Sequence, residues 1–370
     1  MTKPALATVL LAGLLLSPAV ARAEPWIALE AGLKCAACHV NPTGGGKRTE
    51  FGAQYAAREL AAEPLPVATE GGEKDGLPLW TGRVNEYFHL GGDMRTSNRK
   101  REVPNQNNTN AFALDEALLY FEFSLLPGRF TLYVDEQLGP GAALNREAYL
   151  LLRFNQQQLY VKAGRMFLPY GLRLVDDSAF IRQTPGINFT TPDSGVEAGL
   201  DHGPWSAALA VTNGTAGGSE VDSSKQVSVL ATYTQSWWRL GASTNHNRTG
   251  QATRRLANLF LGVKLGRVGL LAEWDRVLDT ALTTARREQQ IGFIEANMRL
   301  WRGQNLKLTH EYLDPDRSVS EDERTRNSVV WEYFFWPYSQ LRLGYRRGEG
   351  IPQNNLQNAR DIFVELHAYF

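Results

Sequence analysis

The sequence Lys34-Cys35-Ala36-Ala37-Cys38-His39 contains both cysteines of the chain and a histidine directly after the second. Two thiols at this spacing followed by histidine form the attachment motif of c-type haem. In that chemistry the thiols add to the porphyrin vinyl groups, and the imidazole becomes an axial iron ligand. We therefore predict one covalent haem c, bound by Cys35 and Cys38 and ligated by His39.

Three other functions of this motif are considered beside haem binding. A thioredoxin-like redox pair belongs to a βαβ context, which the flanking sequence lacks. A structural zinc site usually has four ligands, and the chain has no second cysteine pair. A disulfide between Cys35 and Cys38 would close too short a loop to stabilise much. We expect haem rather than any of these.

Residues 1–23 have the pattern of a secretory signal peptide. Lys3 supplies the positive end, residues 5–16 are apolar, and Ala21-Arg22-Ala23 has the small-x-small form of a cleavage site. A short buried helix is the alternative. The expected mature chain starts at Glu24 and is exported.

The segment that carries the motif is short. We expect a monohaem cytochrome c segment over residues 24–62, with an amphipathic helix near Arg48 to Leu60, and a Pro/Gly/Glu linker over residues 63–79. About 40 residues are too few to bury a haem unaided. The segment is therefore expected to pack against the rest of the chain.

Composition limits what the rest can be. The 370 residues include 39 Lys and Arg against 39 Asp and Glu, so no basic excess exists to bind nucleic acid. After the N-terminus no apolar run approaches the ~20 residues of a membrane helix. A soluble globular protein or a membrane β-barrel remains, because the apolar signal of a barrel is spread over alternating strands.

From Trp80 onward the hydrophobic pattern has period 2, with turn residues at near-regular spacing. Tight turns such as Pro127-Gly128 and Gly203-Pro204 alternate with longer polar connections such as Ser97 to Asn110. This alternation predicts an all-β fold, a sixteen-stranded antiparallel outer-membrane β-barrel over residues 80–370, rather than a soluble all-β domain. The predicted strands lie near 82–95, 111–125, 130–137, 145–154, 159–167, 195–202, 205–213, 226–235, 237–245, 255–265, 267–277, 289–300, 305–313, 327–335, 340–347 and 359–370.

The predicted barrel has an apolar outside and a polar inside. The last strand alternates Ile362, Val364 and Leu366 with Asp361, Glu365 and His367, and tryptophans gather beside the tight turns. Sixteen strands are expected to leave an aqueous lumen rather than a packed core. The long loop 168–194 is expected to fold inward and narrow it.

The second axial ligand of the haem must come from the barrel, from water or from nothing, because the mature chain has no methionine before Met94 and no second histidine near His39. His367 and His89 fall on the lumen face of the last and first strands, which are neighbours when the barrel closes. We propose His367 first and His89 second as the sixth iron ligand. The alternatives are a five-coordinate haem and a haem with water as the sixth ligand.

The chain resembles two families. Cys35, Cys38 and His39, followed by Pro42, Phe51-Gly52 and Tyr55 and then by a barrel, resemble the fused outer-membrane cytochrome–porins of iron-oxidising bacteria. The stretch from Gly164 to Gly171 is weakly similar to phosphate-selective porin O/P-like proteins.

The first resemblance implies electron transport across the outer membrane, between an extracellular donor or acceptor such as Fe(II) and periplasmic cytochromes. The haem segment would lie on the periplasmic side or inside the barrel, and whether the chain is itself an iron oxidase stays open. Five acids on one long loop could attract Fe(II), although a solvated charged loop is the simpler explanation. These acids are Asp314, Asp316, Glu321, Asp322 and Glu323.

A different function also fits the sequence: a solute-transport porin whose haem segment acts as a plug or redox sensor. The two functions make different predictions about the lumen. An occluded lumen favours electron transfer, and a continuous water path favours a porin.

Overall fold

The structure is a computed structural model that describes residues 24–64, 79–250, 252–280 and 286–370. The predicted signal peptide 1–23 and most of the predicted linker 63–79 lie outside the described residues. None of the described helices is long and apolar enough to cross a membrane.

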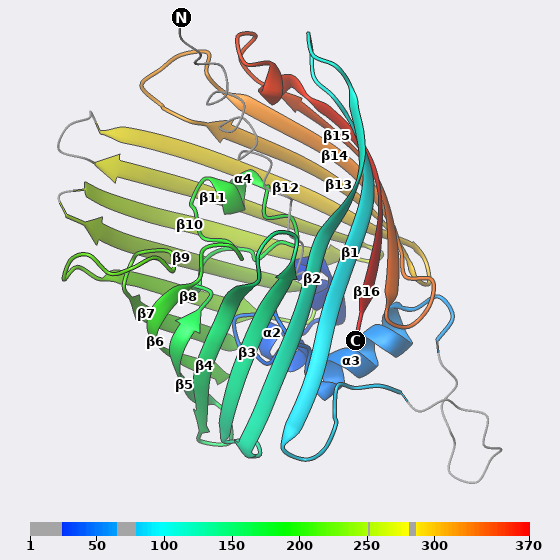
Figure 1. Ribbon diagram of the computed structural model, residues 1–370, viewed down its shortest axis with the longest axis vertical. Helices are drawn as coiled ribbons and strands as arrows, with labels where there is room; N and C mark the ends of the chain where they lie inside the picture. Colours follow the sequence, from blue (N-terminus) through cyan, green and yellow to red (C-terminus); the bar gives the residue numbers. More distant parts are fainter. Residues whose placement is uncertain (1–23, 65–78, 251, 281–285) are drawn as a thin grey trace, which may run out of the picture.

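Sixteen antiparallel strands form a closed barrel, in which β1 pairs with β16 (Figure 1). The predicted fold class is therefore confirmed. The strands are β1 (Phe88–Glu102), β2 (Thr109–Leu126), β3 (Phe130–Gly139), β4 (Leu144–Phe154), β5 (Leu159–Met166), β6 (Asp193–His202), β7 (Trp205–Thr212), β8 (Gln226–Thr234), β9 (Trp238–Thr249), β10 (Ala252–Leu265), β11 (Val268–Thr280), β12 (Arg287–Trp301), β13 (Gln304–Asp314), β14 (Arg324–Tyr333), β15 (Ser339–Glu349) and β16 (Arg360–Tyr369).

Six short helical elements accompany the strands in the described part of the chain. They are α1 (Pro25–Ala31), α2 (Cys35–Cys38), α3 (Glu50–Tyr55), the π-helical turn η2 (Ala56–Leu60), α4 (Phe180–Gln183) and the 3-10 turn η3 (Asn355–Asn358). The first four lie at one end of the barrel, and α4 belongs to the loop between β5 and β6 (Figure 1).

The start and end of the first strand differ from the prediction. β1 runs from Phe88 to Glu102 instead of 82–95, so the connection predicted from Ser97 to Asn110 is only residues 103–108. At the start, the side chain of Asn85 accepts hydrogen bonds from the backbone of Tyr87 and Phe88, both at 2.9 Å, and makes a turn there. At the other end, β16 and β2 pair with the polar residues after Ser97, so a polar composition does not end the strand.

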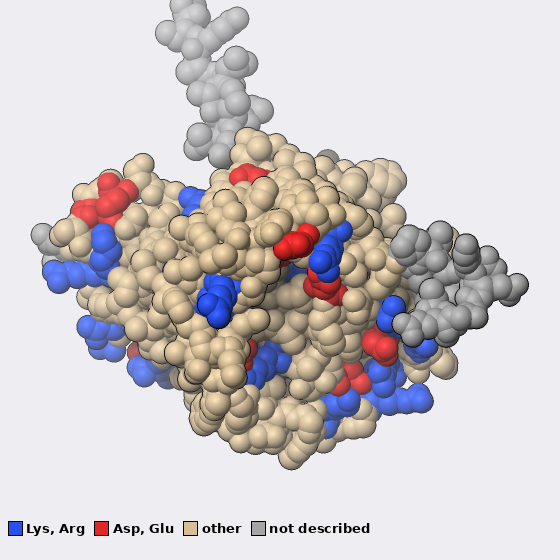
Figure 2. Space-filling view, turned by 90° about the horizontal axis from the view of Figure 1, so that it is seen from below, with Lys and Arg blue, Asp and Glu red and all other residues tan. Residues whose placement is uncertain are grey.

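The outer face has the predicted apolar character. On β16, Ile362, Val364 and Leu366 are exposed, whereas Glu365 and His367 are buried. Tryptophans at the tight-turn end are also exposed, as expected for an interfacial aromatic girdle. Seen from below, the surface carries Lys and Arg in small groups mixed with Asp and Glu, among many uncharged residues (Figure 2).

The expectation of an aqueous lumen is wrong for its middle part. The loop between β5 and β6 folds inward, as predicted, and Tyr170, Leu172, Phe180 and Ile181 from it join one buried apolar cluster. Lumen-facing residues of the wall complete this cluster, because several inward positions of β10 to β13 are apolar. They include Leu256, Phe260, Leu271, Val277, Ile291, Phe293 and Leu313.

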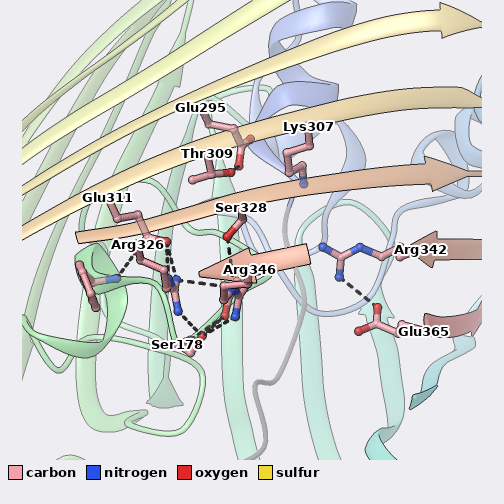
Figure 3. Close-up of polar contacts among 12 residues, drawn as sticks. Ser178, Glu295, Lys307, Thr309, Glu311, Arg326, Ser328, Arg342, Arg346 and Glu365 are labelled. Carbon is pink, nitrogen blue, oxygen red and sulfur yellow. Dashed lines mark hydrogen bonds and ion pairs between the residues drawn. The ribbon is translucent and has the colours of Figure 1, made fainter. Parts of the chain in front are cut away.

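Polar contacts attach the inward loop to the opposite wall. Asp176 accepts hydrogen bonds from Arg346 of β15 and, at 3.3 Å, from Arg326 of β14. Both arginines also donate to the hydroxyl of Ser178, at 2.8 Å and 3.2 Å, as Figure 3 shows. Arg326 further pairs with Glu311 of β13. The loop is thereby fixed across the lumen.

We predict that Asp176→Asn loosens this loop and raises the single-channel conductance of the barrel in planar bilayers. The substitution removes the charge that two mostly buried arginines share, and only Arg326 keeps another acidic partner, Glu311, among the described residues. The cost is expected to be below the about 3–5 kcal/mol of breaking a fully buried pair. Asp316→Asn is the control, because Asp316 makes the same turn with Ser318 in the connection between β13 and β14 but forms no ion pair with a described arginine. Equal conductance of the two variants would contradict the prediction.

Candidate functional site

The N-terminal segment, residues 24–64, is fixed to the tight-turn end of the barrel. Lys34 pairs with Asp201 at the end of β6 and donates to the carbonyl of Trp205 at 2.9 Å. Farther along, the backbone N–H of Ala62 donates to the carbonyl of Phe334 at 2.7 Å. The segment is thus held at the rim on both sides of the haem motif.

Deeper contacts fix the loop that follows the motif. Asn41 is fully buried; its amide donates to Glu147 at 2.9 Å and its oxygen accepts from Lys162 at 3.3 Å. The backbone N–H of Lys47 donates to the hydroxyl of Tyr133 at 2.8 Å, and its ammonium pairs with Glu122 at 3.0 Å. These contacts therefore fix residues 41–47 against β2 to β5.

Local structure in turn fixes the motif. Thr49 caps α3 by accepting from the Gly52 N–H at 3.1 Å, and its hydroxyl donates to the Ala37 carbonyl at 2.8 Å. The Thr49 N–H also donates to the Cys38 carbonyl at 2.9 Å. A Cβ on Gly52 would lie 2.3 Å from that same carbonyl oxygen. The Phe51-Gly52 pair thus allows α3 to pack directly against α2.

Cys35, Cys38 and His39 line one cavity, which lies between the N-terminal segment, the inward loop and the wall. It contains about 1530 Å³ of space between atoms, part of it continuous with solvent. Much of its lining is apolar, including Ile27, Leu60, Leu172, Leu230, Phe260 and Phe334. A planar apolar group attached at the motif would therefore have apolar walls to contact.

The three side chains have the chemistry that covalent haem attachment requires. Both cysteines are free thiols, and burial together with the neighbouring Cys35 raises the pKa of Cys38 to about 11. Burial and the nearby Arg48 guanidinium lower the pKa of His39 to about 4, so its ring is neutral at pH 7. Neutral imidazole is the form that ligates metals, and Nδ1 of His39 is buried without a hydrogen-bond partner.

His367, the first candidate for the sixth ligand, lines the same cavity as His39. Its Nε2 lies 2.6 Å from Oδ1 of Asp93, and its Nδ1 lies 3.1 Å from Oε1 of Gln340. Both ring nitrogens are therefore engaged. The structure brings His367 and the motif to one site but does not leave a nitrogen of His367 free.

His89, the second candidate, does not line this cavity. It lines a separate hollow at the same end of the barrel, and its Nδ1 lies 4.0 Å from Oε1 of Glu50. Met94 and Met298 are exposed on the outer face.

Sequence reasoning missed the four arginines that line the cavity, which are Arg48, Arg95, Arg173 and Arg239. Arg173, from the inward loop, donates to the hydroxyl of Thr43 at 3.1 Å and to the carbonyl of Gly44. Arg239 is buried on the lumen face of β9, beside the exposed Leu240. Period-2 alternation along β9 was a usable signal for Arg239, whereas Arg173 lies in a loop with no such pattern.

The acidic outer loop forms no preassembled metal site. Among the residues that the structure describes, no group of three or more His, Cys, Asp or Glu could hold a metal ion. Asp316 accepts instead from Ser318 of its own loop. The proposal that this loop captures Fe(II) therefore depends on charge alone.

No protein-family model matches the chain, and no curated protein matches it in sequence. Solved structures do match. OmpT of Vibrio cholerae is similar with a TM-score of 0.59 and 11% identity, over 76% of this chain and 99% of that chain. An anion-selective porin from Comamonas acidovorans gives a TM-score of 0.59 and 10% identity, over 76% and 99% of the two chains.

OprB of Pseudomonas putida gives a TM-score of 0.58 and 9% identity, over 77% of this chain and 94% of that chain. At these identities the likeness shows the fold alone. The chain has the fold of an outer-membrane porin, and the N-terminal segment with its cavity is built into that fold.

We predict that Gly52→Ala separates α3 from α2 and loosens the motif, because the added methyl group would overlap the Cys38 carbonyl. Amide hydrogens of residues 36–55 should exchange about 5- to 150-fold faster, as overpacking that costs about 1–3 kcal/mol implies. Gln54→Ala, at an exposed position of the same helix, should leave exchange unchanged. Equal protection in both variants would show that the close approach does not matter.

Proposed function

We propose that the chain is an outer-membrane electron-transfer protein that holds one haem c inside its barrel. Electrons would pass between an extracellular donor or acceptor, Fe(II) among the candidates, and periplasmic cytochromes. The observation that carries the proposal is that Cys35, Cys38 and His39 line one largely apolar cavity within the barrel. A porin without a cofactor has no need of this motif there.

The proposed orientation follows from the connections. Short turns of outer-membrane barrels lie in the periplasm and long loops lie outside. The N-terminal segment contacts the tight-turn end, at Asp201, Trp205 and Phe334. In this orientation the cavity lies toward periplasmic carriers, and the acidic loop lies toward the extracellular medium.

Each residue has a defined part in this proposal. Cys35 and Cys38 would hold the haem covalently, and His39 would ligate its iron. Haem, when bound, supplies a one-electron redox couple. The walls at Leu230 and Phe260 exclude water from it, and Thr49 keeps α2 in position through its bonds to Ala37 and Cys38.

His367 remains our proposed sixth ligand, with His89 second. His367 is preferred because it lines the cavity. Its contact with Gln340 at 3.1 Å is longer than its contact with Asp93 at 2.6 Å, so the Gln340 contact is the one expected to open. A carboxylate on the remote nitrogen is a common partner of a metal-bound imidazole.

A second candidate function is a solute-transport porin in which the N-terminal segment acts as a plug or redox sensor. The comparisons favour it more directly than electron transfer, because the similar structures are porins and one of them is anion-selective. The packed middle of the lumen argues against free diffusion. Ion conductance of the purified full chain at the level of an open porin would favour this second function.

We predict that the double substitution Cys35→Ser and Cys38→Ser abolishes covalent haem, because both thioether positions are lost. The pyridine-haemochrome signal of the purified full chain should fall to background. In liposomes that enclose cytochrome c, Fe(II) added outside should reduce it through the wild-type chain and not through the variant. Unboiled gel mobility is the control for barrel folding. Wild-type protein without a haemochrome signal would end the proposal.

We predict that His367→Ala removes the low-spin bands of the haem spectrum while covalent haem is retained, because the iron loses its second protein ligand. Gln340→Ala is the matched substitution of its neighbour and should keep or strengthen those bands. His89→Ala should leave them unchanged. Low-spin bands that persist in His367→Ala would exclude His367, and their loss in His89→Ala would favour the second candidate.

A further inference from the structure

The charges that line the cavity do not balance. Both acids of its lining are paired: Glu24 contacts Lys307 at 2.6 Å, and Asp201 contacts Lys34. Two of its arginines are paired as well. Arg48 lies 3.5 Å from Asp93, and Arg95 lies 3.0 Å from Glu365.

Arg239 is different. Its side chain lines the cavity with only 7% of its surface exposed, and it makes no ion pair with any residue that the structure describes. Its Nε and Nη1 are buried without hydrogen-bond partners. The ring of Phe260, at 5.9 Å from its guanidinium carbon, is its one aromatic contact among these residues.

An arginine in this environment is a candidate binding site for an anion. A buried charge is stable only when it is paired and hydrogen-bonded. A guanidinium binds a carboxylate by two parallel hydrogen bonds, from Nη2 together with either Nε or Nη1, and none of these nitrogens of Arg239 is bonded to a residue that the structure describes. Arg173, the other cavity arginine without an ion pair, already donates to Thr43, Gly44 and Leu168. Among the described residues of the lining, Arg48 and Arg173 each keep one buried nitrogen without a partner, whereas Arg239 keeps two and has no ion pair.

We propose that Arg239 binds a carboxylate in this cavity, and that the carboxylate is a propionate of the haem. The second part rests on the proposed function, since the haem would be attached at Cys35 and Cys38 of the same cavity. A carboxylate solute that enters the barrel is the other source of the same chemistry. Arg239 lies outside the attachment motif, so its binding of a carboxylate can be tested without changing the residues that attach the haem.

The test compares Arg239→Gln, which removes the charge, with Arg239→Lys, which keeps it. Arg248→Gln is the matched control, because Arg248 lies on the same strand at an exposed position. For each purified full chain we would measure the haemochrome yield, the midpoint potential, and the reversal potential across a planar bilayer in a potassium propionate gradient.

A haem propionate at Arg239 predicts an unchanged haemochrome yield and a lower midpoint potential in Arg239→Gln, because a positive charge near the iron disfavours its oxidised form. Arg239→Lys should shift the potential less, and Arg248→Gln should not shift it. If only the reversal potential changes, Arg239 still binds a carboxylate, but that carboxylate belongs to a solute and not to the haem.

The proposed function fails separately, through a wild-type chain that carries no haem. In that case the reversal potential still tests Arg239. If Arg239→Gln changes neither the midpoint potential nor the reversal potential relative to Arg248→Gln, Arg239 binds no carboxylate here and the inference is overturned.

Discussion

The closure of β1 against β16 is the constraint on which the rest of the structure depends. Every backbone polar group of a membrane-spanning sheet needs a partner within the sheet, and only closure removes the two edges. Here the closing seam does more. Asp93 of β1 contacts His367 of β16, accepts a hydrogen bond from Tyr120 at 2.7 Å, and pairs with Arg48 of the N-terminal segment. The seam, the segment and the candidate sixth ligand therefore share one carboxylate.

A second consequence of closure is that the lumen must be filled with compatible groups. Lumen-facing charges at the core of this barrel are buried, and pairs such as Lys162 with Glu197, at 3.0 Å, satisfy them. The apolar positions of β10 to β13 are covered instead by the inward loop and by Trp26 and Leu29 of α1. The polar side and the apolar side of the lumen wall thus pack against different parts of the chain. This division orients the N-terminal segment without any covalent link to the wall.

The fold could be predicted from the sequence because its signals repeat. Alternation along each strand and tight turns at every second connection locate all sixteen strands. The bounds are less accurate: Asn85 makes a turn that delays the start of β1, and the polar residues after Ser97 still pair with β2 and β16. The packed middle of the lumen could not be predicted, since it depends on which wall faces the loop. The site divides in the same way. Its attachment residues are adjacent in sequence, whereas Arg239 joins them only through the curvature of the barrel.

If the N-terminal segment carries the proposed haem, the cavity gives a physical reason for combining it with a barrel in one chain. The described part of the N-terminal segment is about 40 residues, which is too small to surround a haem with its own side chains. The apolar walls at Leu230, Phe260 and Phe334 come from β8, β10 and the β14–β15 turn. Burial raises the affinity of a site for the neutral porphyrin ring but leaves its charged substituents in need of partners. A wall that supplies apolar surface and an arginine without an ion pair among the described residues would meet both requirements of the proposed haem, which neither the segment nor a water-filled porin would meet alone.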